Sequence, residues 1–210
     1  MTAVLDAITR MFVAPRADAV RVVSVTAAPS AAVCGPAAEP LACALALLLR
    51  RRGPAVVCAW GSAARRPQAP AAVGARRLAA SMDARGLAAR ATGRLVAVAL
   101  DPEPVAAAAE AGRAAAAAGD APVVVALCGP RNEAFDHLLA GQDIAIVAAG
   151  DATDELVRLG VESLEAVVGR SLPAPALGGI GAWRARAGLG AGPATRRALA
   201  PALEALGGRR

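Results

Sequence analysis

Short β-branched runs alternate with longer helical stretches along this chain, and the first two runs lie on either side of Pro29. Residues 20–26 (VRVVSVT) form one apolar run, and residues 31–34 (AAVC) form a second, shorter one. Both have the composition of buried strands, and Pro29 argues against one continuous strand through the two. The pattern leaves open which run precedes the tight turn expected at Gly35 and Pro36.

A strongly apolar helix is expected after that turn, from Glu39 to Arg52. Pro40 lies in its first turn, where a missing N–H is tolerated, and a glutamate there suits the positive end of the helix. The helix is apolar on all sides until its three final arginines, which predicts burial against a sheet. Residues 55–60 (AVVCAW) are expected to form the next strand, so this stretch predicts a right-handed βαβ unit.

The same alternation continues through the second half of the chain. The expected strands cover residues 95–100, 122–127 and 143–148, and the expected helices cover residues 101–118, 132–140 and 151–168. Asp101 and Asp151 are the expected helix caps. Further along, an edge strand is expected over 172–180 and a last helix over 193–206. The spacing predicts an α/β fold with a mostly parallel sheet and helices on both faces.

The first fourteen residues carry an amphipathic helical pattern of their own. Asp6, Thr9 and Arg10 face away from its apolar side. Such a helix fits a membrane surface or a groove on a partner, and it equally fits packing on its own domain. Its candidate interaction residues are Met1, Leu5, Ile8, Met11 and Phe12.

Charge divides the chain into blocks. Residues 50–94 carry ten arginines against one acidic residue, whereas residues 95–169 carry three arginines against twelve acidic residues. The basic block offers a face for acidic partners or nucleic acid, and it equally fits pairing with the acidic block within the fold or between subunits. Its candidate interaction residues are Arg65, Arg66, Arg76 and Arg77.

Three segments are expected along the chain. Residues 1–19 hold the amphipathic helix, residues 20–170 hold the α/β domain, and residues 171–210 form a segment rich in proline, glycine and arginine with a final helix. No basic and apolar leader is evident at the start, and the longest apolar run is far too short to span a bilayer. The expected location is the cytoplasm, with membrane association through the first segment left open.

Residue types missing from the sequence exclude several kinds of chemistry. All 23 basic residues are arginine, so no mechanism that needs a lysine is available. The four cysteines form no CxxC pair and lie far in sequence from His137, the single histidine, which argues against zinc. Cys34, Cys58 and Cys128 fall in or at the ends of expected strands, as small buried apolar side chains do. No metal and no cofactor is expected.

The order of these stretches resembles the MinD/ParA group of P-loop ATPases over about residues 20–170. Residues 35–42 (GPAAEPLA) stand where that family has its phosphate loop, and the same kind of apolar helix follows. Residues 55–61 (AVVCAWG), 123–130 (VVVALCGP) and 143–151 (DIAIVAAGD) match the family's later strands, the second of them in place of its Walker-B-like strand. The resemblance implies a P-loop-like, three-layer α/β/α fold.

The residues that the family uses for chemistry are replaced in this chain. No lysine is present, Leu41 or Ala42 falls where a Ser or Thr would hold Mg²⁺, and Cys128 replaces the Walker-B-like acid. A carboxylate in the loop repels phosphate, and a proline removes a backbone N–H donor. The resemblance therefore implies a pseudo-ATPase. Its degenerate phosphate-loop positions are Gly35, Pro36, Glu39 and Pro40.

The expected role is a non-catalytic MinD/ParA-like scaffold or spatial regulator. It would act through protein–protein contacts and self-association, as a homodimer or larger homo-oligomer. Two alternatives stay open, an arginine-rich protein that binds nucleic acid or acidic surfaces, and an enzyme or small-ligand-binding protein with a doubly wound fold. The last predicts a pocket at the carboxyl ends of the strands, near Cys34, Ala59, Asp101 and Cys128.

Two further side-chain features have simpler interpretations. Asp136 and His137 are the residue types of acid–base catalysis, but no nucleophile is tied to them by a motif, so a histidine on a helix surface is expected. Trp183 lies among arginines, and we expect it to be a core or stacking anchor, because a single aromatic side chain is too little for a nucleic-acid stacking platform.

Overall fold

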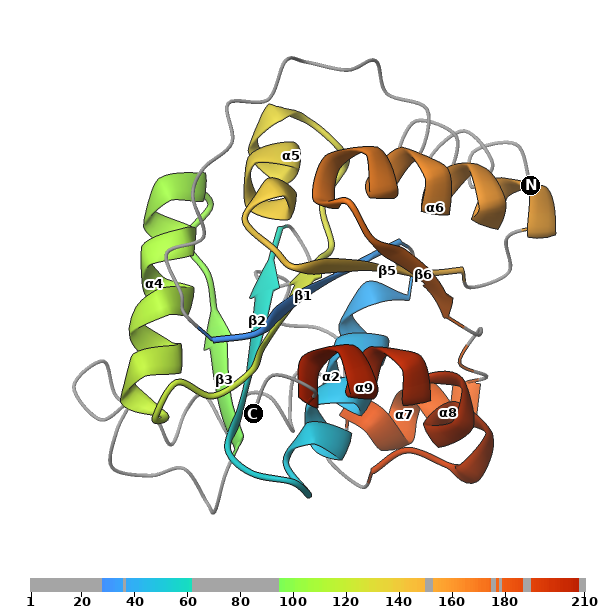
Figure 1. Ribbon diagram of the computed structural model, residues 1–210, viewed down its shortest axis with the longest axis horizontal. Coiled ribbons are helices and arrows are strands. Elements are labelled where there is room, and N and C mark those ends of the chain that lie inside the picture. Colours follow the sequence, from blue (N-terminus) through green and yellow to red (C-terminus); the bar gives the residue numbers. More distant parts are fainter. Residues whose placement is uncertain are drawn as a thin grey trace.

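The computed structural model describes residues 28–35, 37–61, 95–149, 153–174, 177, 179–186 and 190–207. Six strands form one sheet in the order β3-β2-β4-β1-β5-β6, and every neighbouring pair is parallel (Figure 1). The strands are β1 (Ser30–Cys34), β2 (Ala55–Trp60), β3 (Leu95–Ala99), β4 (Val123–Leu127), β5 (Ile144–Ala148) and β6 (Ser171–Ala174). The expected α/β fold with a parallel sheet is confirmed.

Helices cover both faces of this sheet. α4, α5 and α6 pack on one face, while α2 packs on the other with C-terminal helices around it (Figure 1). Alternate side chains of β1 lie on the two faces of the sheet. Val33 packs on the side of α2, and Cys34 packs on the side of the opposite layer. The helices are α2 (Ala38–Leu49), α4 (Pro104–Ala117), α5 (Glu133–Ala140), α6 (Asp154–Val168), α7 (Gly179–Arg186), α8 (Pro193–Ala198) and α9 (Ala200–Gly207).

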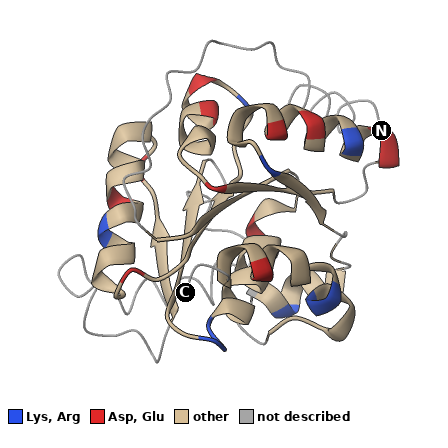
Figure 2. Cartoon of the chain, in the orientation of Figure 1, with Lys and Arg blue, Asp and Glu red and all other residues tan. Residues whose placement is uncertain are grey.

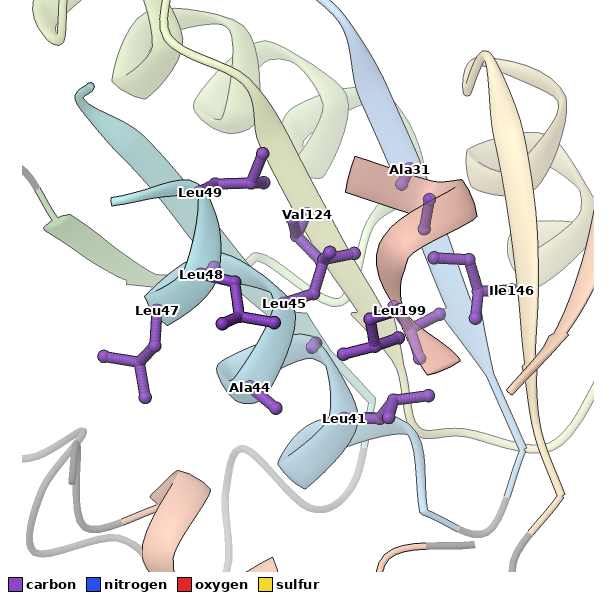
Figure 3. Packing of buried hydrophobic residues seen from close by; sticks show 14 of the residues in the cluster. Ala31, Leu41, Ala44, Leu45, Leu47, Leu48, Leu49, Val124, Ile146 and Leu199 are labelled. Carbon is purple, nitrogen blue, oxygen red and sulfur yellow. The ribbon is translucent and has the colours of Figure 1, made fainter. Parts of the chain in front are cut away.

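α2 is apolar on nearly every side because the sheet covers one side of it and the C-terminal helices cover another. Ten of its twelve residues are buried, as its sequence predicts. Leu45 lies among Val124 and Ile146 of the sheet, and Leu199 from the C-terminal helices joins the same cluster (Figure 3). Beyond the end of α2, Arg52 Nη1 donates a hydrogen bond to the Leu203 carbonyl at 3.2 Å. One arginine of the basic block therefore binds the chain's own C-terminal helix.

Two helices begin later than the sequence predicts. Glu103, not Asp101, caps α4, and its carboxylate accepts hydrogen bonds from the N–H groups of Val105 and Ala106. Asp101 instead accepts from the Glu103 N–H and shapes the preceding turn. α6 is capped by Thr153, and Asp151 lies outside the described residues. In each case a later residue with a suitable oxygen takes the cap position.

The C-terminal segment differs most from its expected pattern. The strand expected over 172–180 is wrong beyond residue 174, because β6 is a short edge strand and α7 begins at Gly179. The single helix expected over 193–206 is two helices, α8 and α9. Pro201 explains the break, since it lacks the N–H that a continuous helix would need at that position. β6 pairs with β5, and α7 and α9 pack on α2.

Several sequence predictions fall outside the described residues. These are the N-terminal helix with Met1, Leu5, Ile8, Met11 and Phe12, the apolar run over 20–26, Arg65, Arg66, Arg76, Arg77, and Pro36. Within the described part, the second apolar run supplies β1, so it is the one that directly precedes Gly35. None of the helices in that part combines the length and hydropathy needed to cross a bilayer.

Candidate functional site at the carboxyl ends of the central strands

The topology places a crevice position between β1 and β4. The two strands are neighbours, but the chain leaves β1 for α2 on one face of the sheet and leaves β4 for α5 on the other. In open parallel sheets, ligands bind outside the carboxyl ends of strands where the connections diverge in this way. Gly35 follows β1 there, and Cys128 and Gly129 follow β4. These residues define the candidate site.

Gly35 brings the end of β1 directly against the backbone of β5. Its φ is +116°, and a Cβ placed on it would lie 2.5 Å from the Ala148 carbonyl oxygen. Only glycine adopts this conformation without strain and permits this approach. On the side that faces β5, the turn therefore leaves no room for a side chain.

The N-terminus of α2 offers few donors to an anion. The Ala38 N–H donates to the Gly35 carbonyl at 3.1 Å, and Pro40 has no N–H. At most one N–H of the first three helical residues, that of Glu39, is left for a ligand. The Glu39 carboxylate lies in the same turn, where it suits the helix dipole and repels a phosphate. A phosphate cradle needs several convergent N–H groups at this place.

Trp60 lies at the end of β2, next to the loop that follows β4. Its side chain is buried, and its indole Nε1 donates to the Pro102 carbonyl at 3.3 Å. The ring lies so close to Gly129 that a Cβ there would be 3.4 Å from it. At Gly61, with a φ of +107°, a Cβ would lie 2.6 Å from the Gly129 nitrogen. The β2 end and the loop after β4 are thus packed together.

A buried ion pair lies just beyond β4. Arg131 Nε donates to Asp136 Oδ1 at 2.7 Å, and the exposed fractions of the two side chains are 4% and 12%. Arg131 Nη1 also donates to Ser163 Oγ, which ties the loop after β4 to α5 and α6. This guanidinium is neutralised by Asp136, so it is not a free cation for an incoming phosphate. No local motif marks Arg131 in advance, although it is the only arginine between 114 and 157.

The buried cysteines of the site are neutral thiols. Burial raises the pKa of Cys34 well above its usual range, and this outweighs the lowering by Arg131, while Cys128 and Asp136 add to the rise. Burial, with a smaller contribution from Glu110, raises the pKa of Cys58 to about 12. A nucleophilic or metal-binding cysteine acts as a thiolate, and neither residue supplies one at neutral pH.

Asp136 and His137, the two residue types of acid–base catalysis, differ in their surroundings. Asp136 accepts from Arg131, and His137 is half-buried on α5 with its Nε2 unpaired among the described residues. The described part of the chain holds no group of three or more His, Cys, Asp or Glu side chains that could bind a metal ion.

The structure brings together only part of the expected site. Gly35, Glu39 and Pro40 surround the turn, and Cys128 lies across the crevice at the end of β4. Trp60 and Arg131 are additional members, and their positions follow from the strand order, which sequence reasoning did not provide. Comparison with family models, curated proteins and solved structures finds no match for this chain. The MinD/ParA resemblance stays a prediction.

Proposed function

We propose that this chain is a non-catalytic, P-loop-like scaffold or spatial regulator that acts through protein–protein contacts and self-association. The observation that carries the proposal is the turn between β1 and α2, which offers few of the groups that hold a phosphate. The Ala38 N–H donates to the Gly35 carbonyl, Pro40 has no N–H, and Glu39 adds a carboxylate. A protein that bound a nucleotide at this place would need several convergent donors there.

The electrostatics of the crevice support the same role. Phosphoryl transfer depends on positioned positive charge and a metal ion around the phosphates. The sequence has no lysine, Arg131 is paired with Asp136, and Glu39 adds negative charge at the helix N-terminus. The alternative of a small-ligand protein predicts a pocket near Cys34, Ala59, Asp101 and Cys128. Complete burial of Cys34 and the packing at Gly129 favour the scaffold.

Nucleotide binding is the direct test. A ligand at about 100 times its Kd stabilises a folded protein by about 2.7 kcal/mol, which would raise the Tm of a chain this size by about 5–10 °C. We expect no shift with ATP and Mg²⁺ and no phosphate release. Both would be measured by thermal unfolding and by a phosphate assay on the full chain.

A Glu39→Gln variant separates the chain's own activity from a contaminant. It removes the carboxylate at the start of α2 and keeps the side-chain shape. Hydrolysis in the wild type that this variant alters, together with an ATP-dependent shift in Tm, would overturn the scaffold role. Equal traces of hydrolysis in both preparations, without a shift in Tm, would identify a contaminant and leave the proposal standing.

A further inference from the structure

The three exposed large apolar side chains of the described residues lie in two places, a pair on α7 and one residue on α4. Ile180 and Trp183 of α7 are 79% and 56% exposed, and Val105 of α4 is 62% exposed. Ile180 and Trp183 are three residues apart, so they share one side of α7. A single exposed apolar residue is ordinary, but an isoleucine and a tryptophan side by side mark a contact surface.

A basic residue adjoins this pair. Arg184 is exposed next to Trp183, and Figure 2 shows basic positions on both α7 and α8. Ala185 is buried where α7 packs on α2, which fixes the direction in which the exposed side of α7 faces. We call Ile180, Trp183 and Arg184 the α7 face.

Acidic residues flank the other place. Val105 lies in the first turn of α4, beside the exposed residues Asp101, Pro102 and Glu103. The two carboxylates are held in position because each accepts a backbone N–H, and both stay exposed. We call Asp101, Pro102, Glu103 and Val105 the α4 start. The α4 start has negative charge around an exposed apolar side chain, whereas the α7 face has positive charge beside its exposed apolar side chains.

The two patches lie on opposite sides of the sheet. α4 belongs to the layer of α5 and α6, whereas α7 packs on α2 in the other layer (Figure 1). One molecule therefore cannot bring its own two patches together, while two copies can. Opposite charge on two exposed apolar patches is the arrangement that selects a partner and its orientation.

We propose that the α7 face of one copy docks on the α4 start of a second copy. This inference rests on the proposed scaffold role and specifies its mode of self-association. Trp183 covers Val105 and Pro102, and Arg184 faces the carboxylates of Asp101 and Glu103. The contact joins two different surfaces, so each copy keeps one patch of each kind free. Assembly therefore grows head to tail, into a ring or an open chain.

Two single substitutions block the two patches separately. Trp183→Glu sets an acid against the acidic α4 start, and Val105→Arg sets a base against the basic α7 face without touching the helix cap. Matched controls carry the same change of charge elsewhere on exposed helix positions: Arg113→Gln for the first and Glu165→Gln for the second. Assembly of each full-length protein is followed by sedimentation velocity over a range of concentration and salt.

The wild type is expected to gain mass with concentration and to lose it with salt. Each blocking variant should weaken assembly by about tenfold or more, while the controls stay near the wild type. Mixed together, the two blocked variants should form one-to-one pairs and nothing larger, because each retains the patch that the other lacks. Trp183 fluorescence gives a second signal, since Trp60 is the only other tryptophan and is already buried.

Other outcomes overturn the docking. A wild type that stays monomeric, blocked variants that assemble normally, or a mixture that does not pair would each do so. Controls that weaken assembly as strongly as the blocking variants would assign it to net charge alone, which also overturns it. Assembly that persists despite both substitutions leaves the scaffold role intact, whereas ATP binding removes that role whatever the assembly state.

Discussion

Gly35 is the residue on which the candidate site depends most. Its φ of +116° and the 2.5 Å that would separate a Cβ at this position from the Ala148 oxygen leave no room for a side chain. Gly35→Ala should lower the free energy of unfolding by about 3 kcal/mol or more, from backbone strain and the clash together. Urea unfolding of the two proteins measures the difference.

Gly119 is the matched control for that substitution. It too has a positive φ, +74°, but nothing lies within 4 Å of where its Cβ would be. Gly119→Ala should cost only about 1 kcal/mol, the conformational part alone. Equal losses at the two positions would mean that the approach to β5 does not constrain the turn.

At the residue scale, the sequence predicts which residues suit a structural role better than it predicts which other residues they contact. Asp101 and Glu103 are both good cap residues, and only the helix start decides that Glu103 takes the position. The turn at Gly35 follows from the glycine and the apolar run before it. The pairing of Arg131 with Asp136 depends on how α5 leaves β4, and the burial of Trp60 depends on which strands are neighbours. No local sequence pattern predicts the ion pair or the burial of Trp60.

At the scale of elements, α2 packs on the C-terminal helices as well as on the sheet. Leu199 is fully buried in the cluster that joins them. Leu199→Ala should therefore cost about 2–5 kcal/mol through lost burial and the cavity left behind. Val105→Ala, at a position 62% exposed, should stay within about 0.5 kcal/mol. Denaturant midpoints compare the two, and similar losses would contradict the role given to Leu199.

Strands and long helices were predictable because their apolar patterns are strong. β2 has the expected bounds, and the parallel sheet makes its central strands continuously apolar. The strand predicted over 172–180 is wrong beyond residue 174, because the prolines and glycines in this apolar stretch suit both a short edge strand and a helix start. Trp183 was expected to be a core or stacking anchor. Its exposure on α7 contradicts a place in the core, because the smaller Ala185 is the residue that α7 buries against α2.

At the scale of the whole molecule, alkaline pH should destabilise the fold through its cysteines. Burial raises the pKa of Cys58 from 9.0 to about 12 and raises the pKa of Cys34 in the same direction. Above pH 9 the unfolded chain releases these protons while the folded chain keeps them. The free energy of unfolding should then fall by up to about 1.4 kcal/mol per pH unit for each thiol.

The composition makes this pH dependence unusually clean. The sequence has no tyrosine and no lysine, so the cysteines dominate titration between pH 9 and 12. Urea unfolding at pH 8, 9.5 and 10.5 measures the slope, and Cys58→Ala should remove one thiol's share of it. A slope unchanged in that variant would show that burial of Cys58 does not govern its ionisation.

The fold class was predictable from the sequence, and the state of the candidate site was predictable only in part. The missing lysine and the Glu39-Pro40 pair already argue against a phosphate. That Trp60 packs against Gly129 and Gly35 lies against the β5 backbone depends on strand order and on close backbone contacts, which no local pattern specifies.

The strand order also determines when the sheet can form while the chain emerges from a ribosome. Within the described sheet β1 pairs with β4 and β5, so Ser30 must wait for Val123 before its first ladder can form. At about 5–20 residues per second, that delay is on the order of 10 s. During this time β2 can pair with β3, but the sheet that covers α2 lacks its central strands. The nascent chain should therefore expose its most apolar helix to chaperones before the middle of its sheet exists.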